Sequence, residues 1–246
     1  MPRFARILVI VLLLGLAGLA GPLLAQSERA AASAPGDDRA DVALDPGHSS
    51  WDVGAAGGGL REYELTLDVA RRARVWLEAL GYHVRLTRED NRRVAPDVPR
   101  DPIAAIESEQ RARHQAVGDP RVYVSIHFNG HPDPTLRGTE TYFNGDNYGA
   151  ASRRLAAEVH AATFRALTGA GYTSMDRGVR EDLAAGKPYG HFYSLRGPFP
   201  SALIEVLFLS NPTDVAIVRD EAARDVLAQG IAAGIAAFLA LEDEGL

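Results

Sequence analysis

One segment of eight residues constrains the fold more than any other part of the chain. Residues 202–209 read ALIEVLFL, and seven of these eight side chains are apolar. A strand with so uniform an apolar character is covered on both faces, which is the environment of a central strand in a mostly parallel sheet. Because helices provide that cover in α/β proteins, this segment predicts an α/β fold.

The rest of the chain alternates short apolar runs with amphipathic helical patterns. The further predicted strands are residues 42–45, 83–88, 122–128 and 139–143, and the predicted helices are residues 64–80, 102–117, 149–167 and a C-terminal segment that ends at 241. This alternation predicts a mostly parallel twisted sheet flanked by helices on both faces. Ligands of such sheets bind beyond the carboxyl ends of the strands, so polar side chains at those ends are the candidates for function.

The first 25 residues have the pattern of an export signal. Arg3 and Arg6 precede an apolar run over residues 7–25 that ends in small residues. The run is also close to the minimum length of a membrane span, so an uncleaved anchor, and with it a membrane tether, is the alternative. Residues 26–41 are polar and aperiodic, which predicts a flexible linker before a single folded domain over residues 42–246. We therefore expect an exported protein of the periplasm, cell envelope or extracellular space.

Composition excludes several classes of site. The chain contains no cysteine, which rules out disulfides, thiolate metal sites and a cysteine nucleophile. Any bound metal must then be held by histidine and carboxylate. The net charge is −6 and no basic cluster occurs outside the N-terminal end, which argues against a nucleic-acid partner. The oligomeric state stays open, with a monomer as the simplest expectation.

Three candidate metal ligands come at strand ends or at the start of a helix. His48 follows the first predicted strand, Glu62 opens the first long helix, and His127 lies at the end of the strand over residues 122–128. Two histidines and one glutamate form a ligand set that Zn²⁺ accepts, with a fourth position left for water. Each residue alone also has a structural explanation, as a turn histidine, a helix-start carboxylate and a strand-end histidine.

Glu205 lies inside the apolar strand over residues 202–209. A carboxylate in such a strand is costly unless it is paired or functional. If Glu205 lies near a metal-bound water, it can take the proton of that water and later donate it to a leaving amine. The alternative is a buried ion pair, for instance with Arg177. Glu140 is a rival base, but its strand alternates polar and apolar residues, so solvation is the simpler explanation of this carboxylate.

Two further residues are weaker candidates for substrate binding. Asn129 follows the strand-end histidine closely and is placed to orient a ligand or to cap a turn. His191 lies in a predicted loop that would border the cleft.

An ordered set of motifs resembles a known family. The motifs are LDPGHSSWDVGA, EYELTLDVA, LTR, VSIHFNG, GTETYF, DRGVR and PSALIEVLFLSNPTD, and they extend from about residue 42 to residue 241. The chain resembles the zinc-dependent N-acetylmuramoyl-L-alanine amidases, bacterial cell-wall enzymes with a single α/β catalytic domain. The resemblance implies His48, Glu62 and His127 as Zn²⁺ ligands and Glu205 as the catalytic residue. It also implies hydrolysis of the amide between the lactyl group of muramic acid and L-alanine, in peptidoglycan or in soluble muropeptides.

The chain departs from the family pattern in ways that leave its substrate preference open. Ser49 and Ser50 stand where glycines are commoner, Phe128 replaces a small residue, and the stretch over residues 181–191 is longer than usual. Two alternatives to the amidase remain. One is a zinc peptidase that acts on another amide bond of the stem peptide. The other is a catalytically silent wall-binding or regulatory module. The presence of all four candidate residues, His48, Glu62, His127 and Glu205, argues against it.

Overall fold

The structure is a computed structural model that describes residues 39–245. The predicted export signal and residues 26–38 of the predicted linker lie outside the described residues. The first strand, β1 (Val42–Pro46), begins at the residue where the folded domain was expected to start.

Within the described residues, six strands form one sheet in the order β4-β1-β5-β8-β6-β7. Besides β1, the strands are β4 (Val84–Leu86), β5 (Val122–Asn129), β6 (Thr139–Phe143), β7 (Asp176–Glu181) and β8 (Ser201–Phe208). Strands β4, β1, β5 and β8 are parallel to one another. Strand β6 is antiparallel to β8 and parallel to β7. The prediction of a mostly parallel sheet is therefore confirmed.

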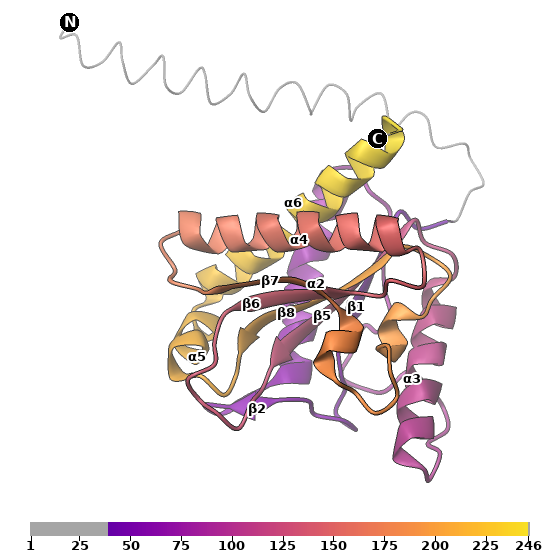
Figure 1. Cartoon of the computed structure of the whole chain (residues 1–246), viewed down its shortest axis with the longest axis horizontal. Helices are drawn as coiled ribbons and strands as arrows, with labels where there is room; N and C mark the ends of the chain where they lie inside the picture. Colours follow the sequence, from indigo (N-terminus) through magenta and orange to yellow (C-terminus); the bar gives the residue numbers. More distant parts are fainter. Residues whose placement is uncertain (1–38, 246) are drawn as a thin grey trace, which may run out of the picture. The chain divides into compact units, whose positions relative to one another are not determined.

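Helices cover both faces of this sheet, as predicted (Figure 1). The helices are α2 (Glu62–Ala79), α3 (Pro102–Val117), α4 (Gly149–Gly169), α5 (Pro212–Arg219) and α6 (Glu221–Asp243). Val42, Val124 and Ile204 point from the sheet into the main core, which α2, α4, α5 and α6 complete. Ala43 and Tyr123 point to the opposite face, where α3 packs. Successive strand residues alternate between faces, so His127 and Glu205 lie on the α3 face.

Helix α6 is long and apolar enough to cross a membrane, but half of its most apolar window is buried. It packs closely against α4. A Cβ atom on Gly230 would lie 2.6 Å from Thr163 Cα, and one on Gly234 would lie 2.5 Å from Val159 Cα. The two glycines therefore let the helix backbones approach, which is the packing of a core helix.

Most element boundaries follow the sequence prediction. The helix over residues 102–117 and the strand over residues 139–143 occur with the predicted bounds. Asn211 caps α5, because its side chain accepts hydrogen bonds from the N–H groups of Thr213 and Asp214. Strand β7 was not predicted, nor were the short hairpin β2 (Ala56–Gly57) and β3 (Leu60–Arg61). Strand β7 lies at the sheet edge and has no buried residue, so it lacks the apolar alternation that reveals a strand.

Candidate metal centre and its pocket

Three separate chain segments bring His48, Glu62 and His127 together. His48 follows β1, Glu62 is the first residue of α2, and His127 lies on β5 near its carboxyl end. One ligand atom from each lies within 4.8 Å of the others. The Oε1 atom of Glu62 is 2.9 Å from His127 Nδ1 and 3.4 Å from His48 Nε2. The three residues can therefore bind one metal ion.

The Glu62 carboxylate is buried and fixed by main-chain donors. Its Oε1 atom accepts the N–H of Phe128 at 3.0 Å, and its Oε2 atom accepts the N–H of Ala55 at 2.6 Å. Burial raises the pKa of Glu62, but the hydrogen bonds and charges of His127 and His48 outweigh it and hold this pKa well below the usual range. Glu62 therefore presents an ionised oxygen to the two imidazoles.

The His48 backbone adopts a left-handed conformation with φ of 60°, which is uncommon for a residue other than glycine. Its Nδ1 atom lies 2.9 Å from Asp52 Oδ2, so its Nε2 atom faces Glu62. Burial lowers the pKa of His48, but the bonds to Asp52 and Glu62 raise it to about 10. Gly47 leaves the space that the other imidazole needs, since a Cβ atom there would collide with the ring of His127.

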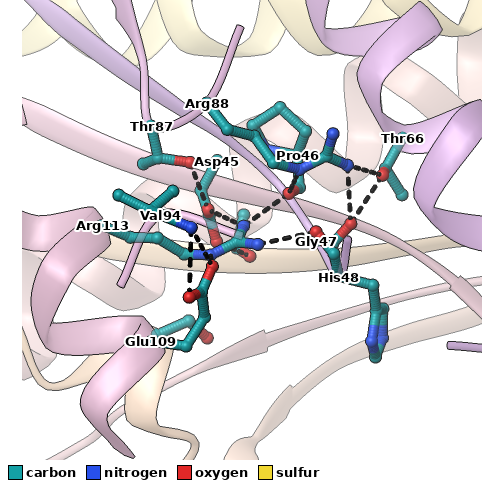
Figure 2. Close-up of polar contacts among 12 residues, drawn as sticks. Asp45, Pro46, Gly47, His48, Thr66, Thr87, Arg88, Val94, Glu109 and Arg113 are labelled. Carbon is teal, nitrogen blue, oxygen red and sulfur yellow. Dashed lines mark hydrogen bonds and ion pairs between the residues drawn. The ribbon is translucent and has the colours of Figure 1, made fainter. Parts of the chain in front are cut away.

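A buried arginine on α3 holds the chain segment before His48 (Figure 2). Arg113 donates to Asp45 Oδ1 at 2.7 Å. It also donates to the carbonyl oxygens of Pro46 and His48, each at 2.6 Å. Burial raises the pKa of Asp45, but the charge of Arg113 and hydrogen bonds outweigh it, so this pKa lies well below its usual value. Asp45 and Arg113 therefore form a buried ion pair beside the candidate metal centre.

A second arginine, Arg88, approaches the same segment from the other side in Figure 2. It donates to the carbonyl oxygens of Pro46 and Gly47, both at 3.0 Å, and to that of Tyr63 at 2.7 Å. Three successive carbonyls, those of residues 46–48, thus accept hydrogen bonds from guanidinium groups. Burial and the nearby charge of Arg113 lower the pKa of Arg88 to about 10. The imidazole of His48 points away from both arginines in Figure 2, so the arginines do not obstruct it at the candidate metal centre.

Glu205 lies beside His127 in the sheet, because β5 and β8 pair these two residues. Its Oε2 atom is buried and has no hydrogen-bond partner within residues 39–245. Burial, and after it the charge of Glu62, raise the pKa of Glu205 well above its usual value. A buried carboxylate oxygen without a partner carries an energetic cost, which points to a role in binding or chemistry.

Arg177, the ion-pair partner suggested for Glu205 in the alternative to proton transfer, instead binds Glu140 of the neighbouring strand. Arg177 Nε donates to Glu140 Oε2 at 2.8 Å, and Tyr142 Oη donates to Glu140 Oε1 at 3.0 Å. Glu140 is buried, so its explanation by solvation was wrong. The reason is that β6 lies between β8 and β7, and Arg177 of β7 reaches across to the Glu140 side chain.

One pocket contains the imidazoles of His48 and His127 together with Glu205. The segment after β1, helix α3 and the segment after β7 form most of its walls: Ser49, Trp51, Asp52, Ile106, Glu109, Gln110, Arg113, Lys187, Tyr189, Phe192, Tyr193 and Ser194. The loop of His191 was expected to border the cleft, and its neighbours Lys187, Tyr189 and Phe192 do line the pocket. The sequence did not single out these three residues, because the loop shows no periodicity.

The two weaker candidates lie outside the lining of this pocket. Asn129 donates to Glu140 Oε1 at 2.6 Å, and its own side-chain oxygen accepts the N–H of Gly130. His191 contacts Asp182 at 2.6 Å through Nδ1 and Asp146 at 3.1 Å through Nε2. Both side chains thus have structural partners, and their contacts with a substrate stay predictions.

Known proteins resemble this chain in both sequence and fold. A family model described as N-acetylmuramoyl-L-alanine amidase matches residues 42–237. The amidase LytC of Bacillus subtilis is 29% identical over 198 residues, which are 80% of this chain and 35% of LytC. The germination-specific N-acetylmuramoyl-L-alanine amidase of the same organism is 30% identical over 196 residues, which are 79% of this chain and 77% of that protein.

Among solved structures, the catalytic domain of the amidase CwlV from Bacillus (Paenibacillus) polymyxa var. colistinus superimposes with a TM-score of 0.65 at 29% identity. The match covers 81% of this chain and 97% of that domain. The chain therefore spans about a third of LytC but nearly the whole of an amidase catalytic domain.

Proposed function

The chain belongs to the N-acetylmuramoyl-L-alanine amidase family, and we propose that residues 42–246 are a zinc-dependent catalytic domain. The domain hydrolyses the amide between the lactyl group of N-acetylmuramic acid and the L-alanine of the peptidoglycan stem peptide. The observation that carries this proposal is the position of Glu205, a half-buried residue whose buried Oε2 atom has no hydrogen-bond partner within residues 39–245, beside the cluster of His48, Glu62 and His127.

The donor set fits Zn²⁺. Two imidazole nitrogens and one carboxylate oxygen are common zinc ligands, and they leave a position for water and substrate. Asp52 binds the second ring nitrogen of His48, which is the usual way in which proteins orient a metal-binding histidine. When bound, the metal supplies a Lewis acid that polarises the substrate carbonyl and lowers the pKa of a bound water.

Glu205 is placed to move the proton in this reaction. Its register with His127 puts its carboxyl on the same face of the sheet as the three ligands. Glu205 accepts a proton from the attacking water and transfers it to the nitrogen of the leaving L-alanine. The water's oxygen ends on the lactyl group, which becomes a carboxylate, and both of its protons end on the nitrogen of L-alanine, which becomes an ammonium group, so atoms and charge balance.

The test is an end-group analysis of digested peptidoglycan. We expect the purified protein with zinc to release new N-terminal L-alanine without new reducing sugar ends, and chelation to abolish the release. The variant Glu205→Gln should retain its zinc and its fold but lose at least about 100-fold in turnover. A different new N-terminus would move the cleaved bond and exclude the amidase, and full activity of Glu205→Gln would exclude the assigned role.

The site of action requires export, because peptidoglycan lies outside the cytoplasmic membrane. We propose that residues 1–25 direct this export and that residues 26–41 link the signal to the catalytic domain. Sequencing the N-terminus of the protein recovered from the cell envelope tests this: a start near residue 26 supports cleavage, and an intact N-terminus supports a membrane tether.

A further inference from the structure

Four basic side chains line the pocket, and three of them have acidic partners. His48 pairs with Asp52 and Glu62, His127 pairs with Glu62, and Arg113 pairs with Asp45 and Glu109. Lys187, the only lysine of the chain, is the fourth. Within residues 39–245 its ammonium group has neither a hydrogen bond nor an ion pair. The pocket thus contains one cation that is available to a ligand.

Lys187 lies near the reacting centre. Its Nζ atom is 5.8 Å from the centre of the Phe192 ring, which also lines the pocket. Burial is the largest influence on the pKa of Glu205 and raises it, whereas the charge of Lys187 acts in the opposite direction. The ammonium group is therefore within electrostatic reach of the carboxyl group that we assign to proton transfer.

The wall that carries Lys187 is anchored at several points. Asp182 is fully buried and contacts His191 Nδ1 at 2.6 Å, and it accepts the N–H of Phe192 at 2.7 Å. Arg196 donates to the carbonyl oxygens of Tyr189 and His191, at 2.6 and 2.8 Å. These bonds hold the segment on both sides of Lys187, whose own side chain is exposed and makes none of them.

Three acidic side chains also line the pocket, which restricts where an anion can bind. Asp52, Glu109 and Glu205 all line it, and Glu62 lies behind the two imidazoles. A carboxylate of the substrate is repelled by these acidic groups and attracted by the ammonium of Lys187, which has no acidic partner of its own among the described residues. In the substrate of the proposed reaction, the lactyl carboxyl is already in amide linkage and the N-acetylated sugars are neutral. The carboxylates near the cleaved bond therefore belong to the peptide.

We propose that Lys187 forms a subsite for a carboxylate of the stem peptide and so selects peptides with a free acid over their amidated forms. The proposal rests on the proposed amidase function and adds a substrate class to it. The residue that follows L-alanine is the nearest source of this carboxylate, and the C-terminus of the stem peptide is the other. A charge-assisted hydrogen bond at the edge of a pocket changes affinity by about five- to tenfold.

The experiment compares three soluble muramoyl peptides. The first has all carboxylates free, the second has the carboxylate of the residue after L-alanine amidated, and the third has the C-terminal carboxylate amidated. With the zinc-loaded full chain, we expect kcat/KM to fall about five- to tenfold for one amidated peptide, mainly through KM. The amidated peptide whose kcat/KM falls identifies which carboxylate binds at Lys187.

Three variants separate the subsite from general charge effects. Lys187→Gln should lower kcat/KM for the free acid to the value of the amidated peptide and leave the latter unchanged, whereas Lys187→Arg should keep the preference. Arg153→Gln removes the same charge from an exposed position of α4 and should change nothing. An undiminished preference in Lys187→Gln would overturn the proposal.

A binding measurement keeps the two proposals distinguishable. Calorimetric titration of the zinc-loaded protein with the free-acid and amidated stem peptides gives Kd values that need no turnover. Binding that depends on Lys187 without amide hydrolysis would support the subsite and overturn the reaction. Hydrolysis in which neither KM nor Kd depends on Lys187 would support the reaction and overturn the subsite.

Discussion

Gly54 shows how closely single residues are fitted around the candidate metal centre. Its φ angle is 68°, which favours glycine on conformational grounds alone. In addition, a Cβ atom at this position would collide with Glu62 Oε2 and would lie 2.6 Å from His48 Cδ2. Two of the three candidate ligands would have to move, so this glycine is required by the site as well as by the turn.

We therefore expect Gly54→Ala to weaken zinc binding by at least about tenfold, the size of effect seen when the support of a metal ligand is lost. The matched control is Gly59→Ala, because Gly59 has a φ angle of 78° but nothing within 4 Å of the added atom. Both variants should lose about 1 kcal/mol of stability through backbone strain. Zinc affinity is measured by competition with a chromophoric chelator, and equal affinities in the two variants would contradict the prediction.

At the scale of elements, the connection from β1 to α2 is held by side chains from two other segments. Arg113 comes from α3 and Arg88 follows β4, and both bind carbonyl oxygens of residues 46–48 (Figure 2). A strained conformation persists only when the surrounding structure fixes it. These bonds provide that restraint for His48, whose φ angle is 60°.

We expect Arg113→Lys to lower zinc affinity by about tenfold and stability by a few kcal/mol, because a lysine retains the charge but cannot reach two carbonyls and two carboxylates at once. Arg224→Lys is the control. Arg224 also binds two carbonyls, those of Val218 and Arg219, as well as Asp68, but it lies where α5 meets α6. The control should lose stability without losing zinc affinity, and the prediction fails if Arg113→Lys binds zinc normally.

At the scale of the molecule, the Asp45 pair couples the stability of the fold to pH. Three groups donate to this buried carboxylate, namely Arg113, Ser125 and Thr87. Burial raises the pKa of Asp45, but these groups outweigh it and hold this pKa below the value in the unfolded chain. The group therefore stabilises the fold above the unfolded pKa, about 3.9, and this stabilisation is lost as the pH falls toward the folded pKa.

We expect the titration of Asp45 to lower the free energy of unfolding by about 1 to 3 kcal/mol as the pH falls from about 5 to about 2. Asp45→Asn should be less stable at neutral pH and should show a flatter dependence on pH in this window. Denaturant unfolding across the pH range measures both effects. Asp119→Asn, at an exposed carboxylate, serves as control, and parallel curves for wild type and Asp45→Asn would contradict the assignment.

The sequence by itself determined most of the elements and the residues of the candidate metal centre. Apolar periodicity is a local property, so the helix over residues 102–117 and the strand over residues 139–143 could be located without any knowledge of their neighbours. The positions of His48, Glu62 and His127 followed from the rule that strand ends and helix starts meet at one edge of a parallel sheet. Strand β7 escaped detection because an exposed edge strand carries no such pattern.

Only the tertiary structure decided which charges meet. Arg177 binds Glu140 and leaves Glu205 without a partner within residues 39–245, which depends on the order β8-β6-β7 in the sheet. Lys187 lines the pocket because the segment after β7 folds back beside the strand that carries Glu205. Electrostatic interactions act between residues that the fold brings together, irrespective of their separation in sequence, so a local pattern contains no information about them.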